Sequence, residues 1–174
     1  RQILRALSLE PVGVPSRPEN RLQTAVEDLE GTDVAGLIVA SPGNPTGTML
    51  DRTALARLAG WAQARGAAFI SDEIYHGLHY GDRAVSALEV TPDAWVINSF
   101  SKYFSMTGWR VGWMVVPEDQ IRRVERLAQN LFICPPHASQ VAALAALDCT
   151  EELEANRAVY ATNRGLMLEG LPKA

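Results

Sequence analysis

Three short polar segments carry the residue types that could do chemistry, and each follows an apolar run. They are residues 41–47 (SPGNPTG), 72–75 (DEIY) and 99–102 (SFSK). Lys102 is one of only two lysines in the chain, since 14 of the 16 basic residues are arginine. A lysine amine can form an imine, whereas a guanidinium stays protonated and cannot. Lys102 is therefore a candidate for amine chemistry, although by itself it fits a surface lysine equally well.

Three further side chains could share a ligand with Lys102. Asp72 directly follows a predicted buried strand, Tyr75 lies three residues further on, and Asn44 belongs to the first polar segment. A carboxylate, a phenol and an amide can all hydrogen-bond a common ring. Each also has a plainer interpretation: Asp72 could cap a turn, Tyr75 could pack, and Asn44 before Pro45 could form an ordinary turn. A cis bond before Pro45 would suit so tight a loop.

Ser99, Ser101 and Arg110 could form an anion site. Two hydroxyls, backbone amides at a strand end and a guanidinium eight residues after Lys102 suit a phosphate group. The alternative is a pair of capping serines and a surface arginine. Taken with Lys102, these residues describe a site for an aldehyde-bearing, phosphorylated pyridine. In such a site a lysine supplies the Schiff base, a carboxylate pairs with the ring nitrogen, and hydroxyls with an arginine hold the phosphate.

The periodicity of apolar residues predicts the elements that must position these segments. Continuous apolar runs are typical of strands buried on both faces and are found at residues 34–40, 67–70, 95–98 and 111–116. Helical spacing predicts helices over residues 21–30, 51–65, 118–131, 138–147 and 151–171. A further short strand is expected at residues 10–15, and Asp51 and Gly66 suit the two ends of the second helix.

Strands that alternate with helices predict an α/β fold, with three layers around a doubly wound, mostly parallel sheet. Ligands in such sheets bind outside the carboxyl ends of the strands. All three polar segments leave those ends, so the fold class and the residue content predict the same site.

Composition argues against several other functions. The chain has 174 residues with 47% hydrophobic and 21% charged residues, which is ordinary for a globular protein. Its apolar runs are far shorter than the ~18 residues of a membrane helix. A net charge of −4 argues against a nucleic-acid surface or a basic membrane patch. No metal site is expected, because Cys134 and Cys149 lack ligand spacing. We expect His76 and His79 to pack or to lie on the surface.

In this order and spacing, the three segments resemble the class I/II aminotransferases, which are pyridoxal-phosphate (PLP) enzymes of fold type I. The motifs that carry the resemblance are N-P-T-G at 44–47, S-D-E-I-Y at 71–75 and S-F-S-K…G-W-R-V-G-W at 99–113. The resemblance implies that residues 1–150 are the central part of the PLP-binding large domain. Residues 151–174 would then be a helix leading toward a C-terminal small domain. It also implies a cis bond before Pro45 and a last strand antiparallel to the others.

Matched motif by motif, the resemblance implies a role for each candidate residue. Lys102 would hold PLP as a Schiff base and act as the catalytic base, and Asp72 would pair with the pyridine nitrogen. Asn44 and Tyr75 would contact the ring O3′, and the catalytic residues would be Lys102, Asp72 and Tyr75. The phosphate would be bound by the remaining three residues, Ser99, Ser101 and Arg110.

The activity so implied is transfer of an amino group between an amino acid and a 2-oxo acid, in a homodimer. The family's phosphate-cradling loop, ring-stacking aromatic residue and carboxylate-binding arginine are expected outside these 174 residues. The chain is therefore expected to be an incomplete enzyme that is inactive alone. Two alternatives remain open: a PLP-dependent lyase of the same fold, and an aminotransferase-like sensor domain of a transcription regulator. No targeting segment is visible, and a cytoplasmic location is the default expectation.

Overall fold

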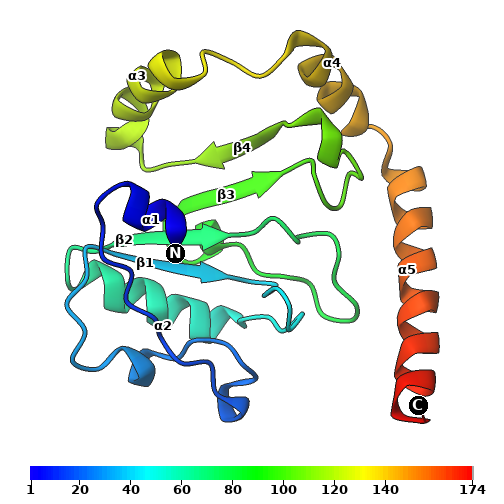
Figure 1. Ribbon diagram of the computed structural model, residues 1–174, viewed down its shortest axis with the longest axis horizontal. Coiled ribbons are helices and arrows are strands. Elements are labelled where there is room, and N and C mark those ends of the chain that lie inside the picture. Colours follow the sequence, from blue (N-terminus) through cyan, green and yellow to red (C-terminus); the bar gives the residue numbers. More distant parts are fainter. Residues whose placement is uncertain (174) are drawn as a thin grey trace.

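The computed structural model describes residues 1–173, which are built around a four-stranded sheet (Figure 1). Strands β1 (Gly36–Ala40), β2 (Ala68–Asp72) and β3 (Trp95–Ser99) are parallel neighbours. Strand β4 (Gly112–Val115) runs antiparallel to β3. The strand order follows the sequence. The predicted mostly parallel sheet and the antiparallel direction of its last strand are both confirmed.

Helices connect and flank these strands. Helix α2 (Arg52–Gln63) joins β1 to β2, and α3 (Ile121–Leu131), α4 (His137–Ala146) and α5 (Thr150–Gly170) follow β4. The remaining helical segments are short: α1 (Gln2–Ala6) and 3-10 turns at Pro18–Asn20, Val26–Leu29, Ala87–Glu89, Thr107–Trp109, Glu118–Gln120 and Leu171–Lys173. Within residues 1–173, no helix is long and apolar enough to cross a membrane.

The main core lies between α2 and one face of the sheet. Asp51 caps α2, since its carboxylate accepts a hydrogen bond from the Ala54 backbone N–H at 2.8 Å. Apolar side chains of α2 pack in one cluster with those of three strands, namely Leu55, Leu58, Ala59, Trp61 and Ala62 with Leu37, Val39, Phe69 and Val96. On the opposite face Ile38 is 53% exposed. The layered arrangement is therefore incomplete in the described chain, as the sequence predicted.

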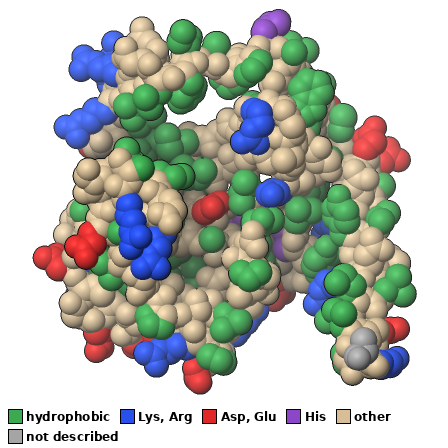
Figure 2. All heavy atoms as spheres, viewed as in Figure 1, with side chains coloured by type: hydrophobic (Ala, Val, Ile, Leu, Met, Phe, Trp, Pro, Cys, Tyr) green, Lys and Arg blue, Asp and Glu red, His purple; other side chains and the backbone are tan. Residues whose placement is uncertain are grey.

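The helices after β4 leave much apolar surface uncovered. In Figure 1, α3 and α4 span the region beyond the β4 edge, and α5 extends along one side of the molecule, away from the sheet. Hydrophobic side chains gather beneath the α3–α4 span in Figure 2. Leu127, Leu131 and Leu144 of these helices are 60%, 69% and 70% exposed. Surfaces of this kind are typical of faces that other protein segments cover.

Residues 21–30 do not form the predicted helix. Arg21 has a left-handed backbone with φ of 54°, which a helix excludes, and the segment contains only the 3-10 turn Val26–Leu29. The Asp28 carboxylate accepts a hydrogen bond from the backbone N–H of Ala25 at 3.0 Å. A local side-chain contact with the backbone has therefore replaced helical hydrogen bonds, which periodicity does not reveal.

The strand predicted at residues 10–15 is also wrong, because that segment pairs with no strand among residues 1–173. The predicted helix at residues 118–131 begins as the 3-10 turn Glu118–Gln120 before α3 continues it. The other predicted strands and helices are confirmed with shifted ends. Residue 174, the last of the predicted segment 151–174, lies outside the described residues.

Candidate active site

The three polar segments lie together at the carboxyl end of the parallel strands. In the sheet register Asp72 pairs with Ala40 of β1 and with Ile97 of β3. These residues therefore share the face that α2 does not cover, and Ser99, two residues after Ile97, shares it too. The carboxylate of Asp72 and the hydroxyl of Ser99 thus project from neighbouring strands onto one face of the sheet.

Asn44 and Tyr75 are in direct contact. The loop that carries Asn44 contains two cis peptide bonds, Ser41–Pro42 and Asn44–Pro45, and the second was expected. The Asn44 Nδ2 donates a hydrogen bond to the Tyr75 Oη at 3.0 Å. Both residues line a pocket of about 520 Å³. The amide and the phenol that the sequence assigned to one ligand therefore lie side by side.

Lys102 lies next to the same phenol. Its Nζ is 5.5 Å from the centroid of the Tyr75 ring, and its side chain is half-buried. The turn that carries it is closed by a hydrogen bond from the backbone N–H of Ser105 to the carbonyl of Lys102 at 2.9 Å. The structure thus places the amine of Lys102 beside the Tyr75 ring, whose hydroxyl in turn contacts Asn44.

Asp72 also forms the local contact expected of a residue that caps a turn. One carboxylate oxygen, Oδ1, accepts a hydrogen bond from the backbone N–H of Ile74 at 3.2 Å. Asp72 is half-buried at the end of β2, whereas its neighbours Ser71 and Glu73 are only 1% and 2% exposed. The turn contact uses one of the two carboxylate oxygens, so capping the turn and contacting a ligand are compatible roles.

Ser99 and Ser101 meet, while Arg110 contacts its own turn. The Ser99 Oγ donates to the Ser101 Oγ at 2.8 Å and accepts from the Ser101 backbone N–H at 3.0 Å. It also lies 3.2 Å from the carbonyl oxygen of Val111, the residue after Arg110. The exposed Arg110 side chain donates from Nη1 to the carbonyl of Thr107 at 2.9 Å.

The buried carboxylate of Glu73, whose role the sequence did not indicate, holds together the segments that carry the site. Glu73 Oε1 accepts hydrogen bonds from Ser71 Oγ at 3.0 Å and from the Ala87 backbone N–H at 2.7 Å. His76 bridges two loops, with Nδ1 3.4 Å from Glu73 Oε2 and Nε2 3.0 Å from the carbonyl oxygen of Ser41. No local pattern distinguishes Glu73 from Asp72, since its burial depends on the distant Ala87 segment.

A second polar cluster lies beside Lys102 and includes α5. The Tyr103 Oη donates to Glu154 Oε1 at 2.7 Å, and Arg157 Nε donates to Glu154 Oε2 at 2.8 Å. Burial, followed by the hydrogen bond to Glu154, raises the pKa of Tyr103. The hydrogen bonds from Tyr103 and then Arg157 lower the pKa of Glu154. Burial, and then the charge of Arg157, lower the pKa of His79.

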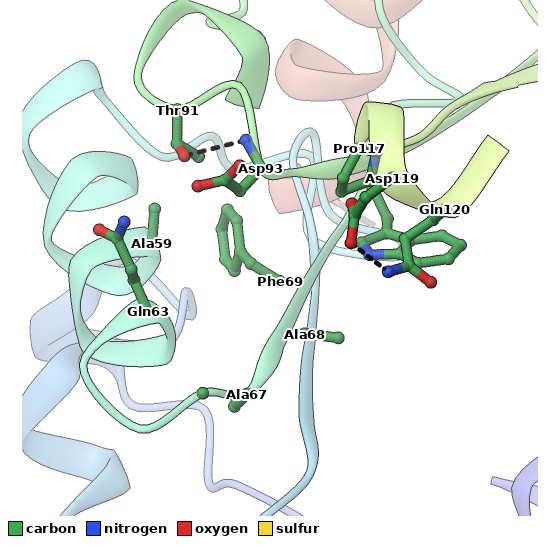
Figure 3. A pocket seen from close by; sticks show the side chains of 12 residues that line it. Ala59, Gln63, Ala67, Ala68, Phe69, Thr91, Asp93, Pro117, Asp119 and Gln120 are labelled. Atoms are coloured by element: carbon green, nitrogen blue, oxygen red, sulfur yellow. Dashed lines mark hydrogen bonds between the residues drawn. The ribbon is translucent and has the colours of Figure 1, made fainter.

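Another hollow, of about 440 Å³, lies at the opposite end of the sheet (Figure 3). In Figure 3 the Phe69 ring lies between side chains of α2 and the segment that carries Pro117 and Gln120. Ala68 and Trp95, at the amino ends of β2 and β3, also line it. It is therefore separate from the lysine site. Among residues 1–173, no group of three or more His, Cys, Asp or Glu side chains is arranged to hold a metal ion.

The fold and site define a class of α/β proteins with a lysine after a central strand, beside a phenol–amide pair. The family model described as aminotransferase class I and II matches residues 1–174, so the chain belongs to this family. Members of this family are pyridoxal-phosphate enzymes.

Individual relatives agree with this family. A valine–pyruvate aminotransferase from Mycobacterium tuberculosis is 45% identical, over 98% of this chain and 46% of that protein. A crystal structure from Silicibacter pomeroyi is 70% identical with a TM-score of 0.96, over 99% of this chain and 47% of that one. The structure of the aspartate aminotransferase from Thermus thermophilus with maleate is 30% identical with a TM-score of 0.92. The match covers 99% of this chain and 47% of that one. The chain thus spans about half the length of these relatives.

Proposed function

We propose that the chain forms the cofactor-binding core of a PLP-dependent aminotransferase that moves an amino group between an amino acid and a 2-oxo acid. The observation that carries this proposal is the meeting of three side chains from separate loops. Asn44 Nδ2 lies 3.0 Å from Tyr75 Oη, and Lys102 Nζ lies 5.5 Å from the Tyr75 ring. Because the chain spans about half the length of its relatives, the proposal concerns the full-length protein, and we expect residues 1–174 alone to be inactive.

The donors and acceptors of this chain fit PLP. Lys102 offers an amine for the cofactor aldehyde, and the contacting pair of Asn44 and Tyr75 offers hydrogen bonds to the ring hydroxyl. Asp72, at the end of β2 and next to β1, offers a carboxylate that can pair with the pyridine nitrogen. The phosphate would be bound by the hydroxyls of Ser99 and Ser101, whose oxygens lie 2.8 Å apart. The exposed guanidinium of Arg110 would complete this phosphate site.

When bound, PLP supplies an aldehyde that condenses with amines and a ring that accepts electrons. With PLP present, Lys102 would be the residue that holds the aldehyde group, and its amine would be the base that accepts the proton from the substrate's α carbon. The Asp72 carboxylate would favour a protonated ring nitrogen, which would help the ring to accept electrons. Asn44 and Tyr75 would orient the cofactor ring relative to the Lys102 amine.

Aminotransfer is favoured over the lyase and sensor alternatives, because the relatives reported above with a named reaction are aminotransferases.

We also propose that the full-length protein is a homodimer. The exposed indole of Trp109, of which 46% is accessible, supports a contact surface close to the Lys102 turn. Light scattering coupled to size exclusion should give twice the monomer mass, and a monomeric mass would contradict this part of the proposal.

The decisive test is Lys102→Ala in the full-length protein. We expect borohydride reduction of the wild type with PLP to leave a pyridoxyl group on the peptide that contains Lys102. In Lys102→Ala we expect no such group, and a transamination rate at least about a thousandfold lower. Lys173→Ala is the matched control and should behave as the wild type.

Wild-type activity in Lys102→Ala would overturn the proposed function. The amino acceptor separates a transaminase from a lyase. Without added 2-oxo acid a transaminase stops after the first half-reaction, with one amino acid converted per site, whereas a lyase continues to form its product.

A further inference from the structure

We propose that Tyr103, Glu154 and Arg157 form a latch between α5 and the Lys102 turn. In this latch Tyr103 and Glu154 are positioning residues for the Lys102 amine. The inference rests on the proposed function of Lys102. It adds that the position of α5 helps to determine where this amine lies.

The latch holds one carboxylate between two loops of the candidate site. Glu154 of α5 accepts from Tyr103 Oη at 2.7 Å on one oxygen and from Arg157 Nε at 2.8 Å on the other. Arg157 also donates from Nη1 to the carbonyl of His79 at 3.3 Å. Tyr103 is the residue after Lys102, and His79 belongs to the loop that carries Tyr75. Helix α5 is therefore hydrogen-bonded to both loops, and the bonds to Glu154 are charge-assisted.

The Tyr103 ring is confined as well as hydrogen-bonded. Gly77 has φ of 92°, and a Cβ at that position would lie 2.5 Å from the ring, so the ring packs directly on the backbone of the Tyr75 loop. The ring also meets Phe104 edge to face, with centroids 5.2 Å apart. Phe104 in turn packs on Phe100, with centroids 4.6 Å apart. Because Tyr103 is held in this way and directly follows Lys102, its ring limits how far the backbone of the Lys102 turn can shift.

Helix α5 depends on these polar contacts, because packing holds little of it. Among its 21 residues, all within the described part of the chain, only Leu153 is buried. The Arg164 guanidinium lies 5.4 Å from the Tyr80 ring centroid and adds a weaker exposed contact. A displacement of α5 would therefore act on the bond between Tyr103 and Glu154, and through Tyr103 on the Lys102 turn.

The first test compares turnover in variants of the full-length holoenzyme. We expect Tyr103→Phe and Glu154→Ala to lower kcat about tenfold, the effect of losing one hydrogen bond to a charged group, with little change in KM. Glu154→Gln keeps an acceptor for the phenol and should recover most of kcat. Tyr160→Phe removes an exposed phenol from the same helix and should leave kcat unchanged. The double variant Tyr103→Phe/Glu154→Ala should be no slower than either single variant.

The second test measures the position of the amine without cofactor. Brief acetylation of the cofactor-free protein with acetic anhydride, read by peptide mass spectrometry, gives the labelling of Lys102 relative to Lys173. We expect this ratio to rise about threefold in Tyr103→Phe and Glu154→Ala, because the turn is released, and to be unchanged in Tyr160→Phe. A merely structural role would lower Tm while leaving both kcat and the labelling ratio at their wild-type values.

Two outcomes would overturn the latch. One is a folded Tyr103→Phe protein with wild-type kcat and labelling ratio. The other is Glu154→Gln impaired as severely as Glu154→Ala. If Tyr103→Phe does not fold, the comparison of kcat between Glu154→Ala and Glu154→Gln still tests the latch. An inactive Lys102→Ala together with a fully active Tyr103→Phe would reject the latch alone, whereas an active Lys102→Ala would reject the proposed function itself.

Discussion

Asn44 and Tyr75 are 31 residues apart in the sequence, yet their side chains meet at 3.0 Å. The bond between them joins the loop after β1 to the loop after β2. His76 strengthens the same junction, since its Nε2 lies 3.0 Å from the carbonyl oxygen of Ser41. Its Nδ1 lies 3.4 Å from the buried Glu73 carboxylate. The site is thus supported by a buried carboxylate and by half-buried polar groups, and leaving the buried carboxylate unpaired would be costly, which favours one defined geometry.

Asp72→Asn tests the carboxylate role at the scale of one residue. An amide keeps the size of the side chain and can still accept from the Ile74 backbone N–H, but it carries no charge to keep a ring nitrogen protonated. We expect the full-length variant to retain PLP while turnover falls by about a hundredfold or more. PLP absorbance and steady-state assays measure the two quantities. Asp93→Asn, at the opposite end of the sheet, is the control, and unchanged turnover in Asp72→Asn would remove Asp72 from the proposed mechanism.

At the scale of elements, α2 holds the sheet whose strand ends carry the site. Its apolar face packs on β1, β2 and β3, and its N-terminal end has specific side-chain contacts. The Asp51 carboxylate satisfies a backbone N–H at the first turn. The Arg52 Nη2 donates to Glu89 Oε2 at 2.6 Å, which ties the start of α2 to the 3-10 turn Ala87–Glu89. These contacts anchor the helix at the same end of the sheet as the candidate site.

Asp51→Ala tests the cap of α2. We expect it to lower the free energy of unfolding by about 1 kcal/mol, because the Ala54 N–H loses its acceptor. Asp51→Asn keeps a side-chain oxygen and should cost only a few tenths of that amount. Urea denaturation monitored by circular dichroism measures both variants. Equal stability of Asp51→Ala and the wild type would mean that the cap contributes nothing.

Glu89 predicts a pH dependence of stability. Hydrogen bonds from Arg83, then from the Ser86 backbone N–H, and the charge of Arg52 lower its pKa from 4.5 to about 2. A carboxyl group with a lowered folded-state pKa stabilises the fold above the unfolded value, and this contribution is lost as pH falls toward the folded value. Wild type should therefore melt above Glu89→Gln at pH 7, and the difference in Tm should shrink between pH 4.5 and pH 2.

Differential scanning fluorimetry across this pH range measures the effect of Glu89. Glu10→Gln, at an exposed position near the N-terminal end, is the matched control and should show no such pH-dependent difference. A Tm difference for Glu89→Gln that persists unchanged at pH 2 would show that the ionised carboxylate is not its source.

At the scale of the whole molecule, the described chain exposes more apolar surface than an ordinary monomer. Leu131, Phe132 and Ile133, at the end of α3, are 69%, 62% and 78% exposed, and Trp113 and Met114 of β4 are 39% and 42% exposed. Large exposed apolar patches mark surfaces that are covered in the working protein. This agrees with a chain that spans about half the length of its relatives.

This surface predicts different behaviour for residues 1–174 alone and for the full-length protein. We expect the isolated chain to bind the dye 8-anilinonaphthalene-1-sulfonate strongly and to associate as its concentration rises, since its apolar faces are accessible. The full-length protein should bind the dye weakly. Fluorescence titration and analytical ultracentrifugation measure the two effects. A non-associating isolated chain with weak dye binding would contradict this interpretation of the exposed faces.

The sequence alone determined the features that depend on local pattern. Apolar runs marked β1, β2 and β3, helical spacing and Asp51 marked α2, and the order of three polar segments identified the family. These predictions succeed because burial and capping leave their signals within a few adjacent residues. The helix expected at residues 21–30 failed for the opposite reason, since the backbone there is held by side-chain contacts that periodicity does not record.

Only the tertiary structure decided which distant groups meet. Glu73 follows Asp72 directly, yet one is buried beneath the Ala87 segment and the other faces the open side of the sheet. Tyr103 and Glu154 are 51 residues apart, and nothing in either local sequence indicates their contact. Such pairs depend on the path of the whole chain and on the low dielectric of the surfaces that it buries. The sequence therefore determined the chemistry that this protein carries, and the fold decided which groups hold that chemistry in position.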